Sequence, residues 1–159
     1  MENGGCLCLT DVTVKVSSWH GLYALGAGTK MVLKNVTIEK CQWNGVVVRD
    51  GAKFDATGCQ IHQNGRNGVY VDGSTTTARL TNCTSHHNKS DGVCASSGAV
   101  VDLMGEGTSV HDNERSGLSA WNGASTINVY QHCVLNDMSH ENKGKNIDED
   151  DGGIVQQKD

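Results

Sequence analysis

The sequence predicts an all-β protein built as a single-stranded right-handed parallel β-helix of about six coils. Short apolar segments begin at six nearly evenly spaced glycines: Gly21, Gly45, Gly68, Gly92, Gly117 and Gly153. The first four intervals are 24, 23, 24 and 25 residues, and the last is 36 and carries an insertion. Short β-type segments at this period are typical of stacked coils. Twenty glycines, no proline and one phenylalanine suit tight turns around a narrow aliphatic core.

Each coil contains a second segment in which apolar and polar residues alternate around a central turn. It occupies residues 9–14, 33–38, 56–61 and 80–85, with looser copies at 103–110 and 129–135. A third short strand precedes it, for example at residues 30–32 and 53–55. Alternation of this kind indicates strands with one buried face. Six coils of three strands each would form a rod about 29 Å long.

Equivalent residues of successive coils should stack into columns with a spacing of about 4.8 Å. One column of small apolar residues should be buried: Val12, Val36, Cys59, Cys83 and Cys133. A second column lies four residues before each glycine: Ser17, Cys41, Asn64, Asn88 and Asn113. Stacked amides can hydrogen-bond to one another and to the turn backbone, so we expect an asparagine ladder.

We expect one β-helix domain over residues 1–159, with an acidic inserted loop at 143–152. The repeat begins and stops abruptly, without capping segments at either end. Two explanations are open, because open coil ends expose edges for pairing. The chain is either a fragment of a longer solenoid, which we favour, or a unit that associates end to end with other copies.

Composition excludes several classes of partner. A formal net charge of −5 argues against nucleic acid, and the longest apolar runs are too short to span a membrane. Seven cysteines, an odd number without zinc-site spacing, favour a reducing compartment, and the first residues lack a signal peptide. We therefore favour a cytoplasmic location and predict no cofactor.

The segments at 61–71 (IHQNGRNGVYV) and 110–118 (VHDNERSGL) resemble repeats of the pectin-lyase-like superfamily. They are similar to β-helix repeats of carbohydrate-binding and sugar-hydrolase proteins, periplasmic copper-maturation proteins and some F-box ubiquitin-ligase adaptors. The resemblance covers about residues 9–135 and implies the fold. The catalytic elements of pectate lyases and alginate epimerases require proline, which is absent here, and those of polygalacturonases do not occur together.

The position two residues before each glycine holds mostly aromatic and basic side chains: Trp19, Trp43, Arg66, Ser90 and Arg115. Aromatic faces bind the apolar faces of sugars, and guanidinium groups donate planar hydrogen bonds. We therefore predict a ligand-binding surface formed by Trp19, Trp43, Arg66, Arg115, Tyr23 and Tyr70. The alternative is that both tryptophans cover an uncapped end of the core.

The strand after each glycine should present an outward column of Tyr23, Val47, Tyr70, Cys94 and Ser119. Nearby charged residues could complete a catalytic group acting on a uronic acid: Arg49, Asp50, Tyr70 and Asp72. Aspartates are common in turns for conformational reasons alone, so we favour a structural role for these residues and assign no catalytic residue.

Histidines stand six residues before three glycines, at His62, His86 and His111, in a column that begins with Lys15 and Glu39. They are candidates for metal binding, although a linear stack is poor geometry for tetrahedral zinc. A solvated ladder is the alternative, and we place His140 outside this column.

Taken together, these columns predict a non-catalytic recognition or scaffold module that presents outer side chains to a polysaccharide or a protein segment. The alternative is a polysaccharide-active enzyme: a lyase, C5-epimerase or hydrolase acting on uronic-acid polymers.

Overall fold

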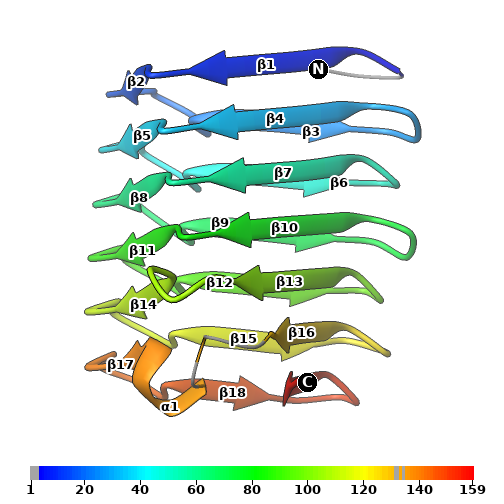
Figure 1. Ribbon diagram of the computed structural model, residues 1–159, viewed down its shortest axis with the longest axis vertical. Helices are drawn as coiled ribbons and strands as arrows, with labels where there is room; N and C mark the ends of the chain where they lie inside the picture. The colour runs from blue at the N-terminus through cyan, green and yellow to red at the C-terminus, as the bar shows by residue number, and fades with distance from the viewer. Residues whose placement is uncertain (1–3, 131–132, 134) are drawn as a thin grey trace.

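The computed structural model describes residues 4–130, 133 and 135–159. It confirms the parallel β-helix: the chain winds around one axis, and each coil lies directly on the next (Figure 1). The strands of successive coils form three parallel sheets of seven, six and six strands. Between them lies a core of aliphatic and small side chains.

Sheet 1 contains β1 (Cys6–Thr10), β4 (Lys30–Lys34), β7 (Lys53–Thr57), β10 (Thr77–Thr81), β13 (Val100–Met104), β16 (Thr126–Val129) and β19 (Ile154–Gln157). Sheet 2 contains β2 (Thr13–Lys15), β5 (Thr37–Glu39), β8 (Gln60–His62), β11 (Thr84–His86), β14 (Ser109–His111) and β17 (Ser139–His140). Sheet 3 contains β3 (Leu22–Leu25), β6 (Val46–Arg49), β9 (Val69–Asp72), β12 (Val93–Ser96), β15 (Leu118–Trp121) and β18 (Ile147–Glu149).

The segments predicted as second strands divide into two strands each. In residues 33–38, for example, Asn35 adopts a positive φ of 51°, so β4 ends at Lys34 and β5 begins at Thr37. A single residue in the left-handed region turns the chain sharply, which is how sheet 1 passes into sheet 2. In the first four coils the corner is therefore encoded by one residue: Asp11, Asn35, Gly58 or Asn82. By contrast, four residues, 105–108, separate β13 from β14.

The last coil differs from the prediction. Ile147 in β18 lies opposite Leu118, so this strand continues sheet 3, whereas Gly153 precedes β19 in sheet 1. Gly153 is therefore not equivalent to Gly117, and 143–152 includes a sheet strand as well as turns. The residues inserted into the last coil instead surround the short helix α1 (Leu135–Met138). The looser copy of the second segment, predicted at 129–135, falls partly outside the described residues. No helix in the described part is long and apolar enough to cross a membrane.

The predicted cysteine-rich column is buried in its middle coils. Val36, Cys59 and Cys83 are buried, but Val12 is 39% exposed because β2 has a neighbouring strand on one side alone. Cys133 is also buried, yet the place after Cys83 belongs to Thr108, as the pairing of β11 with β14 fixes. Cys133 instead donates from its Sγ to the carbonyl of Gly105 at 2.8 Å.

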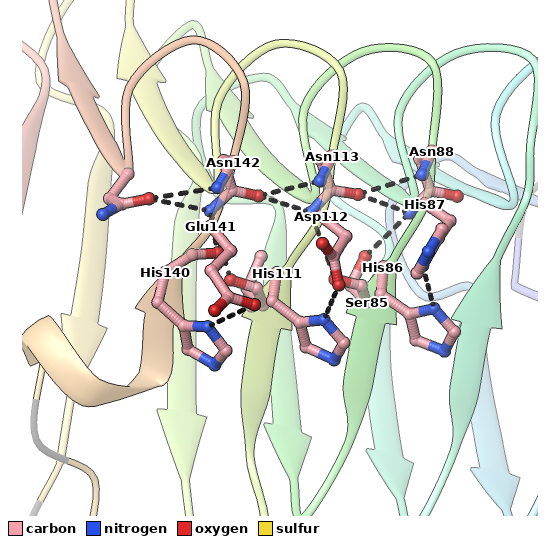
Figure 2. A network of polar contacts seen from close by, with 12 residues as sticks. Ser85, His86, His87, Asn88, His111, Asp112, Asn113, His140, Glu141 and Asn142 are labelled. Atoms are coloured by element: carbon pink, nitrogen blue, oxygen red, sulfur yellow. Dashed lines mark hydrogen bonds and ion pairs between the residues drawn. The ribbon is translucent and has the colours of Figure 1, made fainter.

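The asparagine ladder is present and extends one coil further than predicted (Figure 2). The Nδ2 of Asn64 donates to Oδ1 of Asn88 at 3.0 Å, and Asn88 donates to Asn113 in the same way. Asn113 in turn donates to Oδ1 of Asn142 at 2.9 Å. At the other end, the ladder stops at Cys41, whose backbone N–H donates to Oδ1 of Asn64. The ladder fixes the conformation of the turn between sheets 2 and 3. It therefore also fixes the positions of the residues that follow this turn.

Candidate functional site

The residues that stand two places before the repeat glycines form one column, as the sequence predicts. This column lies along the turn that leads into sheet 3. The backbone N–H of Trp43 donates to the carbonyl of Trp19, and the bonds continue through Arg66 and Ser90 to Arg115, each at 3.1–3.2 Å. These side chains therefore lie in successive coils beside the outer face of sheet 3.

The first part of this face is aromatic. The rings of Trp19 and Trp43 lie 4.9 Å apart, and the guanidinium carbon of Arg66 lies 4.8 Å from the centroid of the Trp43 ring. The ring of His20 stacks on Tyr23 at 5.8 Å. Together they surround a hollow of about 500 Å³ lined by Trp19, His20, Tyr23, Trp43, Asn44, Val47, Arg49, Arg66 and Tyr70.

The next part of the face is more polar. A second hollow, of about 340 Å³, is lined by Asn44, Arg66, Asn67, Tyr70, Ser90, Asp91, Cys94, Arg115 and Trp121. A third, of about 120 Å³, is lined by Arg115, Ser119, Trp121, Asp148 and Asp150. Arg66 and Tyr70 border the first two hollows, and Arg115 and Trp121 border the last two. The three hollows thus form one depression along the coil axis, which we call the axial groove.

Three residues of the predicted outward column are buried in the floor of this groove. Val47, Cys94 and Ser119 have at most 2% exposed surface, although they point away from the core. The large side chains of neighbouring coils cover them: the indole Nε1 of Trp121, for example, donates to Sγ of Cys94 at 3.0 Å. Of this column, the tyrosines alone are partly exposed.

The predicted catalytic group comes together in part. Arg49 donates from Nε and Nη2 to Oδ2 of Asp72 at 2.9 and 2.8 Å, and Tyr70 lies two residues before Asp72 on the same face of β9. Asp50 lies in the turn after β6, where its backbone N–H donates to the carbonyl of Asp72. Burial, and then the charge of Asp72, raise the pKa of Tyr70, so this phenol stays protonated at neutral pH.

The groove also contains a buried carboxylate that sequence reasoning missed. Asp91 is 1% exposed; its Oδ1 accepts from the backbone N–H of Ser116 at 3.1 Å, and its Oδ2 lies 3.6 Å from Nη1 of Arg115. Burial raises the pKa of Asp91, and the positive charge of Arg115 opposes that shift. A buried acid with a raised pKa in a cleft is typical of functional sites.

Asp91 belongs to a second ladder at the position directly before each repeat glycine. The backbone N–H of Asp91 donates to Oδ1 of Asn67, and that of Asn67 donates to Oδ1 of Asn44. The sequence signal was available, since a polar residue precedes each of these glycines. Trp121 was also missed, although it occupies the column of Arg49 and Asp72, four residues after the glycine.

The histidines form a stack at the ends of the sheet 2 strands, just before the same turn; Figure 2 shows three of them, His86, His111 and His140. The rings of His62, His86 and His111 are nearly parallel, with centroids 4.9 and 5.0 Å apart. The prediction that His140 lies outside the column is wrong: its ring stacks on His111 at 5.2 Å because β17 pairs with β14. Among the described residues, no three His, Cys, Asp or Glu side chains converge on a point where they could hold a metal ion.

Stacked imidazoles should make folding sensitive to acid. Burial, followed by the charges of His62, His111 and His87, lowers the pKa of His86 from 6.5 to about 4, and Asp112 opposes this shift. The folded chain therefore resists a proton that the unfolded chain takes up, and stability is lost as pH falls from about 6.5 to about 4. Since the side chain of His86 is partly exposed and solvent screens its charge, we expect a loss of about 1 kcal/mol.

Urea denaturation of the parent chain and of His86→Gln, at pH about 7.5 and about 4.5, measures this loss of stability. The parent should lose more stability between the two conditions than the variant. Equal losses in the two chains would contradict the assigned cause.

The fold and this site define the class: a parallel β-helix with a lined groove along one outer face. The profile of the family described as "Right handed beta helix region" matches residues 2–151, so the chain belongs to this family and its coils are right-handed. No curated protein and no solved structure gives a significant match to the chain.

Proposed function

We propose that the axial groove binds an extended acidic polysaccharide without cleaving it. The observation that carries this proposal is the continuity of three hollows across successive coils through shared residues. The groove runs from the coil of Trp19 to the coil of Asp148, which is five coil steps or about 24 Å. A depression of this length suits a polymer better than a single small molecule.

The chemistry of the lining favours a sugar polymer. Trp19, which packs against Trp43, offers an aromatic face and is 58% exposed, which is unusual for so large an apolar side chain. Arg49 and Arg115 already face carboxylates, whereas Arg66 has no ion pair within the described part of the chain. Its guanidinium is therefore the group best placed to receive a carboxylate from an acidic sugar.

Titration calorimetry with polygalacturonate, alginate and the neutral glucan dextran tests this proposal. We expect binding to at least one of the acidic polymers, and we expect Trp43→Ala to weaken it about tenfold, or about 1.4 kcal/mol. Arg66→Ala should weaken the acidic polymer selectively. Lys53→Ala, an exposed change on sheet 1, is the matched control and should leave affinity unchanged. Failure of both acidic polymers to bind, or binding that these groove variants leave intact, would reject the proposal.

A second candidate function is supported by the buried Asp91. An acid with a raised pKa, facing Arg115 and bordering the same hollow as Tyr70, could transfer a proton to or from a bound sugar. This would make the chain a polysaccharide-active enzyme, with the Arg49–Asp72 pair orienting the substrate. Product formation from a uronic-acid polymer that is abolished by Asp91→Asn favours catalysis, whereas binding without turnover favours the recognition module.

A further inference from the structure

Two cysteines lie on a different face from the groove. Cys6 and Cys8 are exposed on the outer side of β1, while Leu7 and Leu9 between and beside them pack toward the core. The Sγ atoms of the two cysteines lie 3.8 Å apart. The other five cysteines are buried, so this pair is the thiol group that solvent reaches directly.

Strand geometry keeps these two thiols from joining easily as a disulfide. Residues two apart on a strand have Cβ atoms about 6.6 Å apart, because the chain rises about 3.3 Å per residue. A disulfide requires Cβ atoms about 3.5–4.5 Å apart. Pairing of β1 with β4 from Cys6 to Thr10 holds the strand extended, so the thiols can lean together but cannot close without moving the backbone.

The same separation suits a metal ion held between the thiolates. Two sulfur ligands at about 2.3 Å from a tetrahedral ion lie about 3.8 Å from each other. We propose that Cys6 and Cys8 form a two-thiolate site for a thiophilic divalent ion such as Zn²⁺ or Cd²⁺. Sulfur ligands select such ions over Mg²⁺ or Ca²⁺, which prefer oxygen.

The site is open on the solvent side. No third His, Cys, Asp or Glu from the described residues joins the pair, so the remaining coordination positions of a bound ion would be open to water. An open two-ligand site of this kind differs from the closed four-ligand sites that stabilise folds. Loading it should therefore leave the β-helix unchanged.

Titration of the reduced chain with Cd²⁺, followed by the thiolate-to-cadmium charge-transfer absorption, tests the proposal. We expect the absorption to saturate at one ion per chain. Cys6→Ser and Cys8→Ser should each weaken binding at least tenfold, since each removes one of two ligands, and the double variant should lose the absorption. Far-ultraviolet circular dichroism should be the same for all variants, because both side chains are exposed.

The matched control is Thr10→Ala, which changes the next exposed position on the same face of β1. It should bind Cd²⁺ like the parent chain. Absence of the absorption in the parent, its survival in the double variant, or parental affinity in either single variant would overturn the proposal.

Discussion

Replacing Asn88 with alanine should lower the free energy of unfolding by about 3 kcal/mol, measured by urea denaturation. Asn88 has no exposed surface and lies in the middle of the asparagine ladder. Its Oδ1 accepts from the backbone N–H and from the Nδ2 of Asn64, at 3.1 and 3.0 Å. Its Nδ2 donates to Oδ1 of Asn113 at 3.0 Å and to Oγ of Ser85 at 3.2 Å.

The effect is large because alanine removes one partner from several buried groups at once. A buried donor or acceptor left without a partner costs about 1–3 kcal/mol, more than the net gain from one hydrogen bond. In Asn88→Ala the backbone N–H and amide of Asn64 lose their acceptor, and Asn113 loses a donor. The cavity left by the amide adds to the loss.

Gln60→Ala is the matched control, since it removes an amide side chain that is exposed on β8. Its effect should stay within about 0.5 kcal/mol, as for most surface changes. A similar loss for Asn88→Ala and Gln60→Ala would mean that the ladder contributes little to stability.

The repeated parts of the fold could be predicted because the coils stack directly on one another. The period of the sequence therefore equals the number of residues in one coil. Gly45, Gly68 and Gly92 directly precede successive strands of sheet 3, and their order alone predicts which strands pair. The last coil could not be predicted in the same way. There the period is broken: of the acidic residues that suggested a loop, Asp148 and Glu149 belong to β18, and Asp150 and Asp151 follow it.

The sequence predicts which residues of the site share a column, but it does not predict which of their side chains are buried. The sequence indicates that Trp43 and Arg66 share a column, and the structure brings their side chains into contact. It does not indicate that Trp121 reaches across one coil to cover Cys94, because that depends on the lean of one long side chain. The His140 position was missed for a related reason: the bulge around α1 conceals its spacing from His111.

Gly68→Ala should destabilise the chain by at least about 3 kcal/mol, at the upper end of what overpacking causes. A Cβ on Gly68 would lie 2.6 Å from the carbonyl oxygen of Gly92 and 2.8 Å from Nδ2 of Asn88, and closer still to Oγ of Ser85. Cβ atoms do not approach other heavy atoms within 3.0 Å, so the neighbouring coil would have to move. Part of the obstruction is backbone, which cannot rotate away as a flexible side chain can.

Two further variants separate this crowding from a general effect of alanine. Gly107→Ala is the matched control, because its Cβ would meet nothing closer than Oδ1 of Asn82 at 3.3 Å, and we expect a change below about 1 kcal/mol. Adding Ser85→Ala to Gly68→Ala removes the nearest obstructing atom but leaves the Gly92 carbonyl and Asn88 in place. Stability should then remain below that of Ser85→Ala alone by at least about 2 kcal/mol. If the two chains were equally stable in urea denaturation, the serine hydroxyl alone would require glycine at position 68, and close packing of successive coils would not.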